Sequence, residues 1–173
     1  ESGTGGAFHV EDKSSLVVAH LHAEACQSGD RGGVIYAADS QVQLNHARMI
    51  HSNATNDGGC IALTSASSLK AAQVDFKHCA AQSLGQGGGL FLQQESEATL
   101  TSVTMSYCAA SAGGCISATS STLVLDAVAL TDSSAVSTGG CVLFEAGAEM
   151  VSSQRLDSSD LTLHNCSTQL GDG

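Results

Sequence analysis

Seven cysteines are the most reactive side chains of this 173-residue chain. They fall into two groups, and the members of each group recur at about one repeat length: Cys26, Cys79, Cys108 and Cys166 form one group, and Cys60, Cys115 and Cys141 form the other. No C-x-x-C pair is present, so the spacing is poor for a zinc site. The cysteines are therefore expected to form disulfides in an oxidising compartment, or else to pack as small apolar thiols.

Stacked repeats would bring equivalent cysteines about one strand spacing (~4.8 Å) apart, which is within reach of a disulfide. We therefore expect Cys79–Cys108 and Cys115–Cys141 bonds between neighbouring repeats. Diagonal or cross-turn pairs also remain open, namely Cys108–Cys115, Cys60–Cys79 and Cys141–Cys166. An odd number of cysteines leaves one unpaired or joined to a partner.

The histidines are the next candidates for chemistry. His20 and His46 occupy equivalent positions of neighbouring repeats, and His22 follows His20 by two residues. Three imidazoles near one corner could hold a divalent metal, which makes them the candidate metal ligands. Exposed polar corner residues are the simpler interpretation, and we apply it also to His51 and His78, which share another column. We expect no bound metal and no cofactor.

If the repeats stack as β-strands, a catalytic site on them would need several carboxylates or a base on one face that points outward. The outward column of these repeats reads His22, Arg48, Asp75, Thr104, Ala129 and Thr162. Arg48 and Asp75 are neighbours, but the column contains no second carboxylate. We therefore expect a surface ion pair and no catalytic residues.

These residues are positioned by a repeat. Six Gly-Gly pairs, each followed by apolar residues, start 27, 26, 30, 25 and 26 residues apart. The pairs are Gly5-Gly6, Gly32-Gly33, Gly58-Gly59, Gly88-Gly89, Gly113-Gly114 and Gly139-Gly140. Self-similarity at this period indicates a solenoid, in which each repeat buries its apolar face by stacking on its neighbours.

A second column lies upstream of the Gly-Gly pairs and consists of Cys26, Ser52, Cys79, Cys108, Ser133 and Cys166. Apolar residues stand three and five positions before each of these residues, and in most repeats also eight and ten positions before. Apolar residues two apart indicate half-buried strands, so each pair predicts one strand, and the odd step between the pairs predicts a bend. A third strand is expected after Gly-Gly, where Phe8, Ile35, Ile61, Phe91, Ile116 and Val142 align.

Three short strands in each of about six coils predict an all-β, right-handed parallel β-helix with no helical segment, because parallel crossovers are almost always right-handed. The absence of proline agrees, since each strand needs its N–H groups for pairing. We expect one domain over residues 1–173 that is a segment of a longer solenoid. The expected buried residues are Ile61, Val74, Phe76, Phe91, Val103, Met105, Ile116, Val128 and Leu130.

Two strings carry a family resemblance. Phe76-Lys77-His78-Cys79-Ala80 precedes Gly88-Gly89-Leu90, and Met105-Ser106-Tyr107-Cys108-Ala109 precedes Gly113-Gly114-Cys115-Ile116. They resemble the paired FxxN and GGA(I/L/V) motifs of chlamydial polymorphic outer-membrane protein repeats, with Cys or Ser in place of the motif Asn. Similar repeats occur in large secreted proteins of protists and algae. The resemblance implies a surface-exposed right-handed β-helix involved in adhesion.

Charge narrows the range of partners. Acidic residues outnumber basic ones 17 to 6, which gives a formal charge of −11, and the basic residues are scattered. Nucleic acid is therefore not an expected partner. No apolar run approaches the ~18 residues of a membrane span, so we expect no membrane insertion by this segment. Asn53-Ala54-Thr55 and Asn165-Cys166-Ser167 are candidate glycosylation sites, which fits an extracellular or cell-surface location.

The sequence thus predicts a non-enzymatic, extracellular structural or adhesive module of a surface protein, appendage or filament. Its expected partners are neighbouring solenoid coils of the parent chain, like subunits, or a cell-surface glycan. The alternative is a carbohydrate-binding or carbohydrate-active β-helix, similar to polysaccharide lyases or hydrolases, which rests on fold analogy. The scarcity of aromatic residues, with no Trp, two Tyr and four Phe, counts against that alternative.

Overall fold

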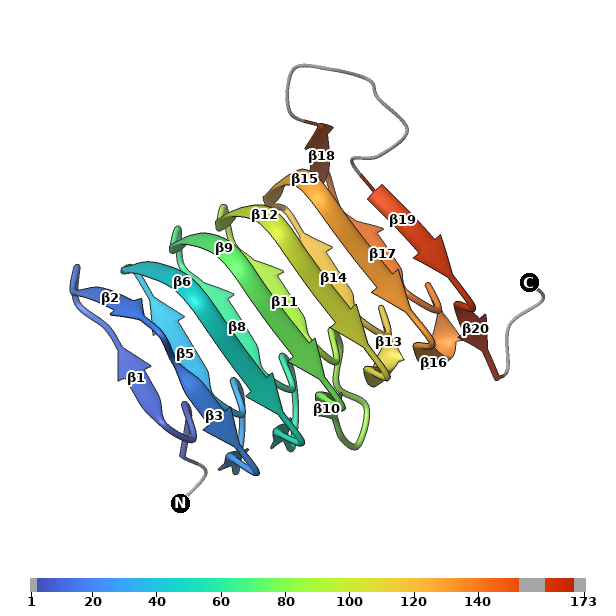
Figure 1. Ribbon diagram of the computed structural model, residues 1–173, viewed down its shortest axis with the longest axis horizontal. Helices are drawn as coiled ribbons and strands as arrows, with labels where there is room; N and C mark the ends of the chain where they lie inside the picture. Colours follow the sequence, from blue (N-terminus) through green and yellow to red (C-terminus); the bar gives the residue numbers. More distant parts are fainter. Residues whose placement is uncertain (1–2, 153–160, 170–173) are drawn as a thin grey trace.

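A computed structural model describes residues 3–152 and 161–169, and within these ranges the chain forms strands and turns with no helix. The strands stack into coils that make about five turns of a β-solenoid (Figure 1). All strand pairs are parallel, and they form three sheets. The expected all-β parallel β-helix with three strands in each coil is confirmed.

We name the sheets A, B and C in the order in which the chain enters them. Sheet A contains β1 (Phe8–Val10), β5 (Ile35–Ala38), β8 (Ile61–Thr64), β11 (Leu90–Gln93), β14 (Ile116–Thr119) and β17 (Val142–Glu145). Sheet B contains β2 (Ser15–Ala19), β3 (His22–Glu24), β6 (Gln41–Ile50), β9 (Ser68–Lys77), β12 (Glu97–Ser106), β15 (Thr122–Thr131), β18 (Glu149–Ser152) and β19 (Leu161–His164). Sheet C contains β4 (Gln27–Ser28), β7 (Asn53–Ala54), β10 (Ala80–Ala81), β13 (Ala109–Ala112), β16 (Ser134–Thr138) and β20 (Ser167–Thr168).

The strand boundaries differ from the sequence prediction in sheet B. The two apolar pairs that were expected to form separate strands lie on one ten-residue strand in β6, β9, β12 and β15. Each strand bends at one residue with positive φ, such as His46 (53°) in β6 or Gln73 (55°) in β9. The bend at this residue accommodates the odd spacing between the two apolar pairs, so the apolar residues on both sides of it point inward. The third strand of each coil is the short sheet C strand that follows the Cys/Ser column.

Gly-Gly pairs form the corner between sheets C and A. In the third pair, Gly58 has a φ of 67°, which glycine adopts at little cost. A Cβ on Gly59 would overlap the carbonyl oxygen of Gly88 and the backbone of Ala80, so neighbouring coils touch at this corner. In the next coil the corner is Gly87-Gly88 and not the expected Gly88-Gly89. Leu90, rather than Phe91, therefore aligns with Ile61 and Ile116.

Columns of equivalent apolar side chains fill the interior. Met49, Phe76, Met105 and Leu130 stack in one column, and none of them is exposed to solvent. All nine residues that were expected to be buried are buried, including Phe91, which lies outside the main core cluster. Each large side chain in such a column contributes about 1.5–3 kcal/mol by burial. Among the described residues there is no helix long and apolar enough to cross a membrane.

Replacing Phe76 with Ala should lower the free energy of unfolding by about 3–5 kcal/mol, because the cavity lies between the rigid side chains of two coils. Urea unfolding followed by circular dichroism measures the loss. Val17→Ala is the matched control, because Val17 is 67% exposed and its truncation should cost less than about 0.5 kcal/mol. Equal losses in the two variants would mean that Phe76 is not a core residue.

Candidate functional site

Two disulfides cross the interior between the Gly-Gly corner and the end of sheet B. Cys60 bonds Cys79 with a Cα–Cα distance of 5.5 Å, and Cys141 bonds Cys166 with a Cα–Cα distance of 5.2 Å. In each case one cysteine precedes the sheet A strand of a coil, and the other follows the sheet B segment of the same coil. These two bonds fit an oxidising environment.

The expected Cys79–Cys108 and Cys115–Cys141 bonds are wrong, and two of the open alternatives are present instead. Equivalent side chains of a parallel stack point in the same direction, whereas Cys60 and Cys79 face each other within one coil. In the coil of Cys108 the residue at the facing position is Gly89, and in the coil of Cys115 it is Ser133. Neither cysteine can therefore form the same bond as Cys60–Cys79.

Cys26, Cys108 and Cys115 are free thiols, and the last two are buried. A hydrogen bond with Cys115, reinforced by burial, raises the pKa of the Cys108 thiol well above its ordinary value. Its backbone N–H donates to the Ser133 hydroxyl at 3.0 Å. A neutral, buried thiol is a poor nucleophile, so Cys108 acts as a small core residue.

The histidines that were expected to be candidate metal ligands do not converge on one point. The rings of His20 and His46 are tilted by 31° with centroids 5.1 Å apart, and His22 lies beside Glu24, with 3.6 Å between Nε2 and Oε2. No group of three or more ligating side chains that could hold a metal ion occurs in the described part of the chain.

A second aromatic column runs along the corner between sheets B and C. The rings of His51 and His78 are parallel within 3° and 4.6 Å apart, and Tyr107 stacks on His78 at 4.9 Å. The pKa of His78 lies below its ordinary value. Desolvation of the charged ring is the main cause, and the nearby His51 and Lys77 disfavour its charge further. Tyr107 occupies the equivalent position in the coil after that of His78, and its contribution to the stack was not expected.

The Arg48–Asp75 pair is present on the outer face of sheet B. Arg48 Nε lies 3.3 Å from Asp75 Oδ2, and the Thr104 hydroxyl donates to Asp75 Oδ1 at 2.9 Å. Both carboxylate oxygens therefore have partners within the protein. This geometry links three successive coils through contacts on the outer face.

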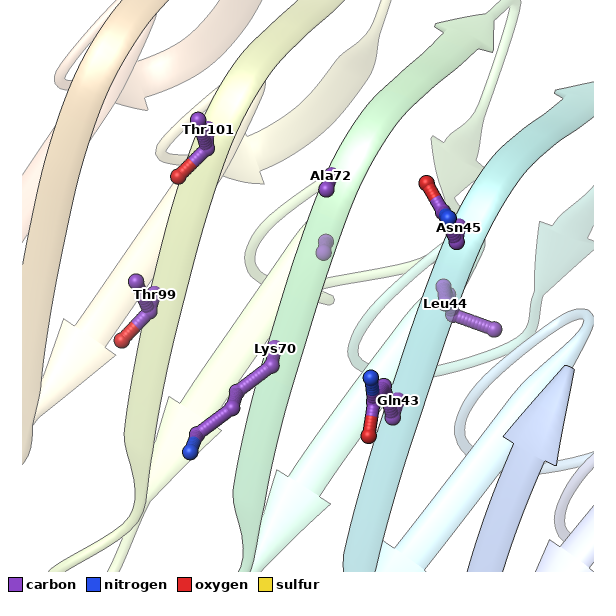
Figure 2. Close-up of a pocket in the computed structure, with 8 residues that line it drawn as sticks. Gln43, Leu44, Asn45, Lys70, Ala72, Thr99 and Thr101 are labelled. Atoms are coloured by element: carbon purple, nitrogen blue, oxygen red, sulfur yellow. The ribbon is translucent and has the colours of Figure 1, made fainter. Parts of the chain in front are cut away.

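A shallow hollow of about 280 Å³ lies on the same face, on the other side of the bend (Figure 2). It is lined by Gln43, Leu44, Asn45, Lys70, Ala71, Ala72, Thr99 and Thr101 of strands β6, β9 and β12. Sequence reasoning missed it, because its polar residues read as ordinary outward positions of strands. The available signal was the small Ala72 between Asn45 and Thr101 in one column.

The candidate glycosylation sites differ in their surroundings. Asn53 lies in strand β7, is half-buried, and accepts a hydrogen bond from Gln82 Nε2 at 3.4 Å. Asn165 is exposed at a bend, donates to Asp132 at 2.8 Å, and precedes the disulfide-bonded Cys166. Asn165 is therefore the more accessible of the two.

Alkylation should detect three free thiols among the seven cysteines when the protein is unfolded without reductant. In the native state only Cys26 should react, because Cys108 and Cys115 are buried. Peptide mapping should recover bridged peptides containing Cys60–Cys79 and Cys141–Cys166. A bridged Cys79–Cys108 peptide would contradict this connectivity.

Nuclear magnetic resonance titration should give His78 a pKa below 6.5, and His51→Gln should raise it toward that value. Because folded His78 binds a proton less readily than the unfolded chain does, its contribution to stability falls as the pH drops through about 6.5. His9 has the opposite sign, because Glu11 raises the pKa of His9 and stabilises the fold at lower pH. An unchanged His78 pKa in His51→Gln would show that the two rings are not coupled.

Comparison with known proteins gives no relative for this arrangement. No protein family model matches the chain, no curated protein matches it, and no solved structure matches it. The resemblance to chlamydial outer-membrane protein repeats therefore stays a prediction from the motifs, and the function has to be argued from the geometry alone.

Proposed function

We propose that this chain is a structural or adhesive β-solenoid module that acts outside the cell, as part of a surface protein, appendage or filament. The observation that carries the proposal is the pair of disulfides, Cys60–Cys79 and Cys141–Cys166, built into a parallel stack. Disulfides of this kind persist in secreted and surface proteins and are rare where thiols are kept reduced.

Links between coils on the outer surface support a rigid scaffold. Arg31 pairs with Asp57 at 3.1 Å, and Asn56 donates to Asp30 at 2.7 Å. Together with the Arg48–Asp75 pair they join side chains about one coil apart in the sequence. Each exposed link is worth little by itself, but together they limit the rotamers of the outer side chains. A rod with fixed surface groups is suited to display and adhesion.

The outermost described coils support partners of the same type. Phe8, Leu16, Val18 and Leu21 in the first coil are only partly buried against the core, as are Val142, Phe144 and Leu161 in the last. Within the described residues the outer edges of β1 and β17 pair with no further strand, and an edge of this kind with apolar side chains can accept a parallel strand. Neighbouring solenoid coils of the parent chain or like subunits fit this surface.

Carbohydrate binding is the second candidate, and the hollow on β6, β9 and β12 favours it. Amide, hydroxyl and ammonium groups that line a surface hollow suit the hydroxyl groups of a sugar. We propose binding, without turnover, as the adhesive contact of the module.

An adhesion assay with oxidised and reduced protein tests the proposal. Beads coated with the secreted, oxidised chain should adhere to target cell surfaces or to beads carrying the same chain. Reduction should lower the free energy of unfolding by roughly 3 kcal/mol for each disulfide, from the entropy of loops that span 19 and 25 residues.

Beads coated with the Cys60→Ser/Cys79→Ser variant control for chemical effects of the reductant. Adhesion equal to that of beads coated with an unrelated acidic protein would contradict the proposal. The release of sugar fragments from a polysaccharide would replace it with the enzymatic alternative.

A further inference from the structure

Three adjacent strands of sheet B present a grid of outward side chains, which we call the sheet B grid. One row contains Gln43, Lys70 and Thr99, and the second contains Asn45, Ala72 and Thr101. Figure 2 shows these side chains along β6, β9 and β12, before each strand bends. Leu44 and Ala71 also line the hollow, and both are buried in the strands beneath it.

The polar side chains of this grid have no partners within the described protein. Gln43, Asn45, Lys70, Thr99 and Thr101 make no side-chain hydrogen bond or ion pair with any described residue. At several other places on the outer surface, polar groups of successive coils join each other. The grid therefore keeps its donors and acceptors free for a ligand.

The contrast is sharpest on the same face of the same sheet. Beyond the bend, Arg48, Asp75 and Thr104 are joined by an ion pair and a hydrogen bond. Elsewhere, Ser65 donates to Gln94 across one coil at 3.2 Å. Stacked polar residues in this fold can thus satisfy one another.

The shape of the hollow depends on Ala72. Its methyl group lies between the longer side chains of Asn45 and Thr101, so the centre of the row is open. The volume of about 280 Å³ is close to the lower end of ordinary small-molecule sites, roughly 300–1,000 Å³. The hollow has room for a small part of a chain-like ligand, whose remainder would lie along the sheet.

We propose that the sheet B grid binds a linear, neutral glycan. Two amides, two hydroxyls and one ammonium can donate to or accept from sugar hydroxyl groups. The formal charge of −11 repels a polyanionic chain, and Lys70 is the only cation among the described residues that line the hollow, so the chemistry favours neutral sugars. Rows of equivalent groups about 4.8 Å apart also match a ligand that repeats along its length.

This inference rests on the proposed adhesive function and names its ligand. None of the described residues that line the hollow is aromatic, so sugar rings have no side chain on which to stack there and binding depends on hydrogen bonds. A single site of this kind is weak. Many copies on one surface would provide firm adhesion through multivalency.

The test titrates the full oxidised chain with three neutral hexasaccharides, made of β-1,4-linked glucose, xylose or mannose. At least one should shift amide resonances of β6, β9 and β12. Ala72→Gln should weaken its binding at least about tenfold, because a longer side chain fills the hollow and blocks the sugar. Ala129→Gln is the matched control, because Ala129 is equally half-buried on the outward face of β15 beyond the bend.

Thr101→Val is a second variant that removes a hydroxyl with little change in shape, and it should also weaken binding. Circular dichroism melting curves check that all variants are folded. The proposal is overturned if none of the neutral probes binds, if a galacturonic acid hexasaccharide binds more tightly than all of them, or if Ala129→Gln weakens binding as much as Ala72→Gln.

Adhesion of coated beads separates this inference from the proposed function. Beads coated with Ala72→Gln should lose adhesion to glycan-bearing surfaces. If they adhere as well as beads coated with the original chain, the grid is not the adhesive contact, although the module still is adhesive.

Discussion

Parallel hydrogen bonding between successive coils is the interaction on which the rest of the structure depends. At the corner, Gly59 N–H donates to Gly87 O at 3.1 Å, and Cys60 N–H donates to Gly89 O at 3.2 Å. These bonds hold equivalent residues of neighbouring coils at one strand spacing. The core columns, the outer links and the position of the sheet B grid follow from that alignment. The first glycine of each pair takes the positive φ of the turn, and the second is needed because the corners touch.

Much of this arrangement could be read from the sequence, because a solenoid repeats its physical requirements. Apolar residues two apart predicted the inward columns, and the nine selected core positions are all buried. The error at the fourth corner came from three consecutive glycines, Gly87-Gly88-Gly89, which fit two registers equally well. Only pairing with the neighbouring coils selects Gly87-Gly88.

The cysteine pairing could not be predicted from the repeat pattern of the sequence. Column membership was correct, but it gives only the equivalent position of each cysteine in its coil and does not say which side chains face each other. Cys79 faces Cys60 across one coil, because the start of the sheet A strand and the end of the sheet B strand meet beside the corner. The bent strands posed a similar problem, since a single positive φ residue such as His46 joins what looked like two strands.

The candidate site was harder to predict than the fold. The pattern placed Arg48 beside Asp75, and the structure joins them. The pattern could not distinguish satisfied from unsatisfied polar groups, so Lys70 and Asn45 looked like any outward residue. The hollow arises from the absence of a long side chain at Ala72, and such an absence becomes visible only when the neighbouring strands are placed beside it.

The stack of coils depends on contact between neighbouring corners, and a Cβ at Gly59 tests this contact most directly. In Gly59→Ala the added methyl group would overlap backbone atoms of Gly88 and Ala80, which cannot move without breaking the stack. Urea unfolding of the oxidised protein should show a loss of more than about 3 kcal/mol. Gly3→Ala is the control, because no heavy atom lies within 4 Å of its Cβ position. A loss at Gly59 as small as that at Gly3 would contradict the stacked-coil structure.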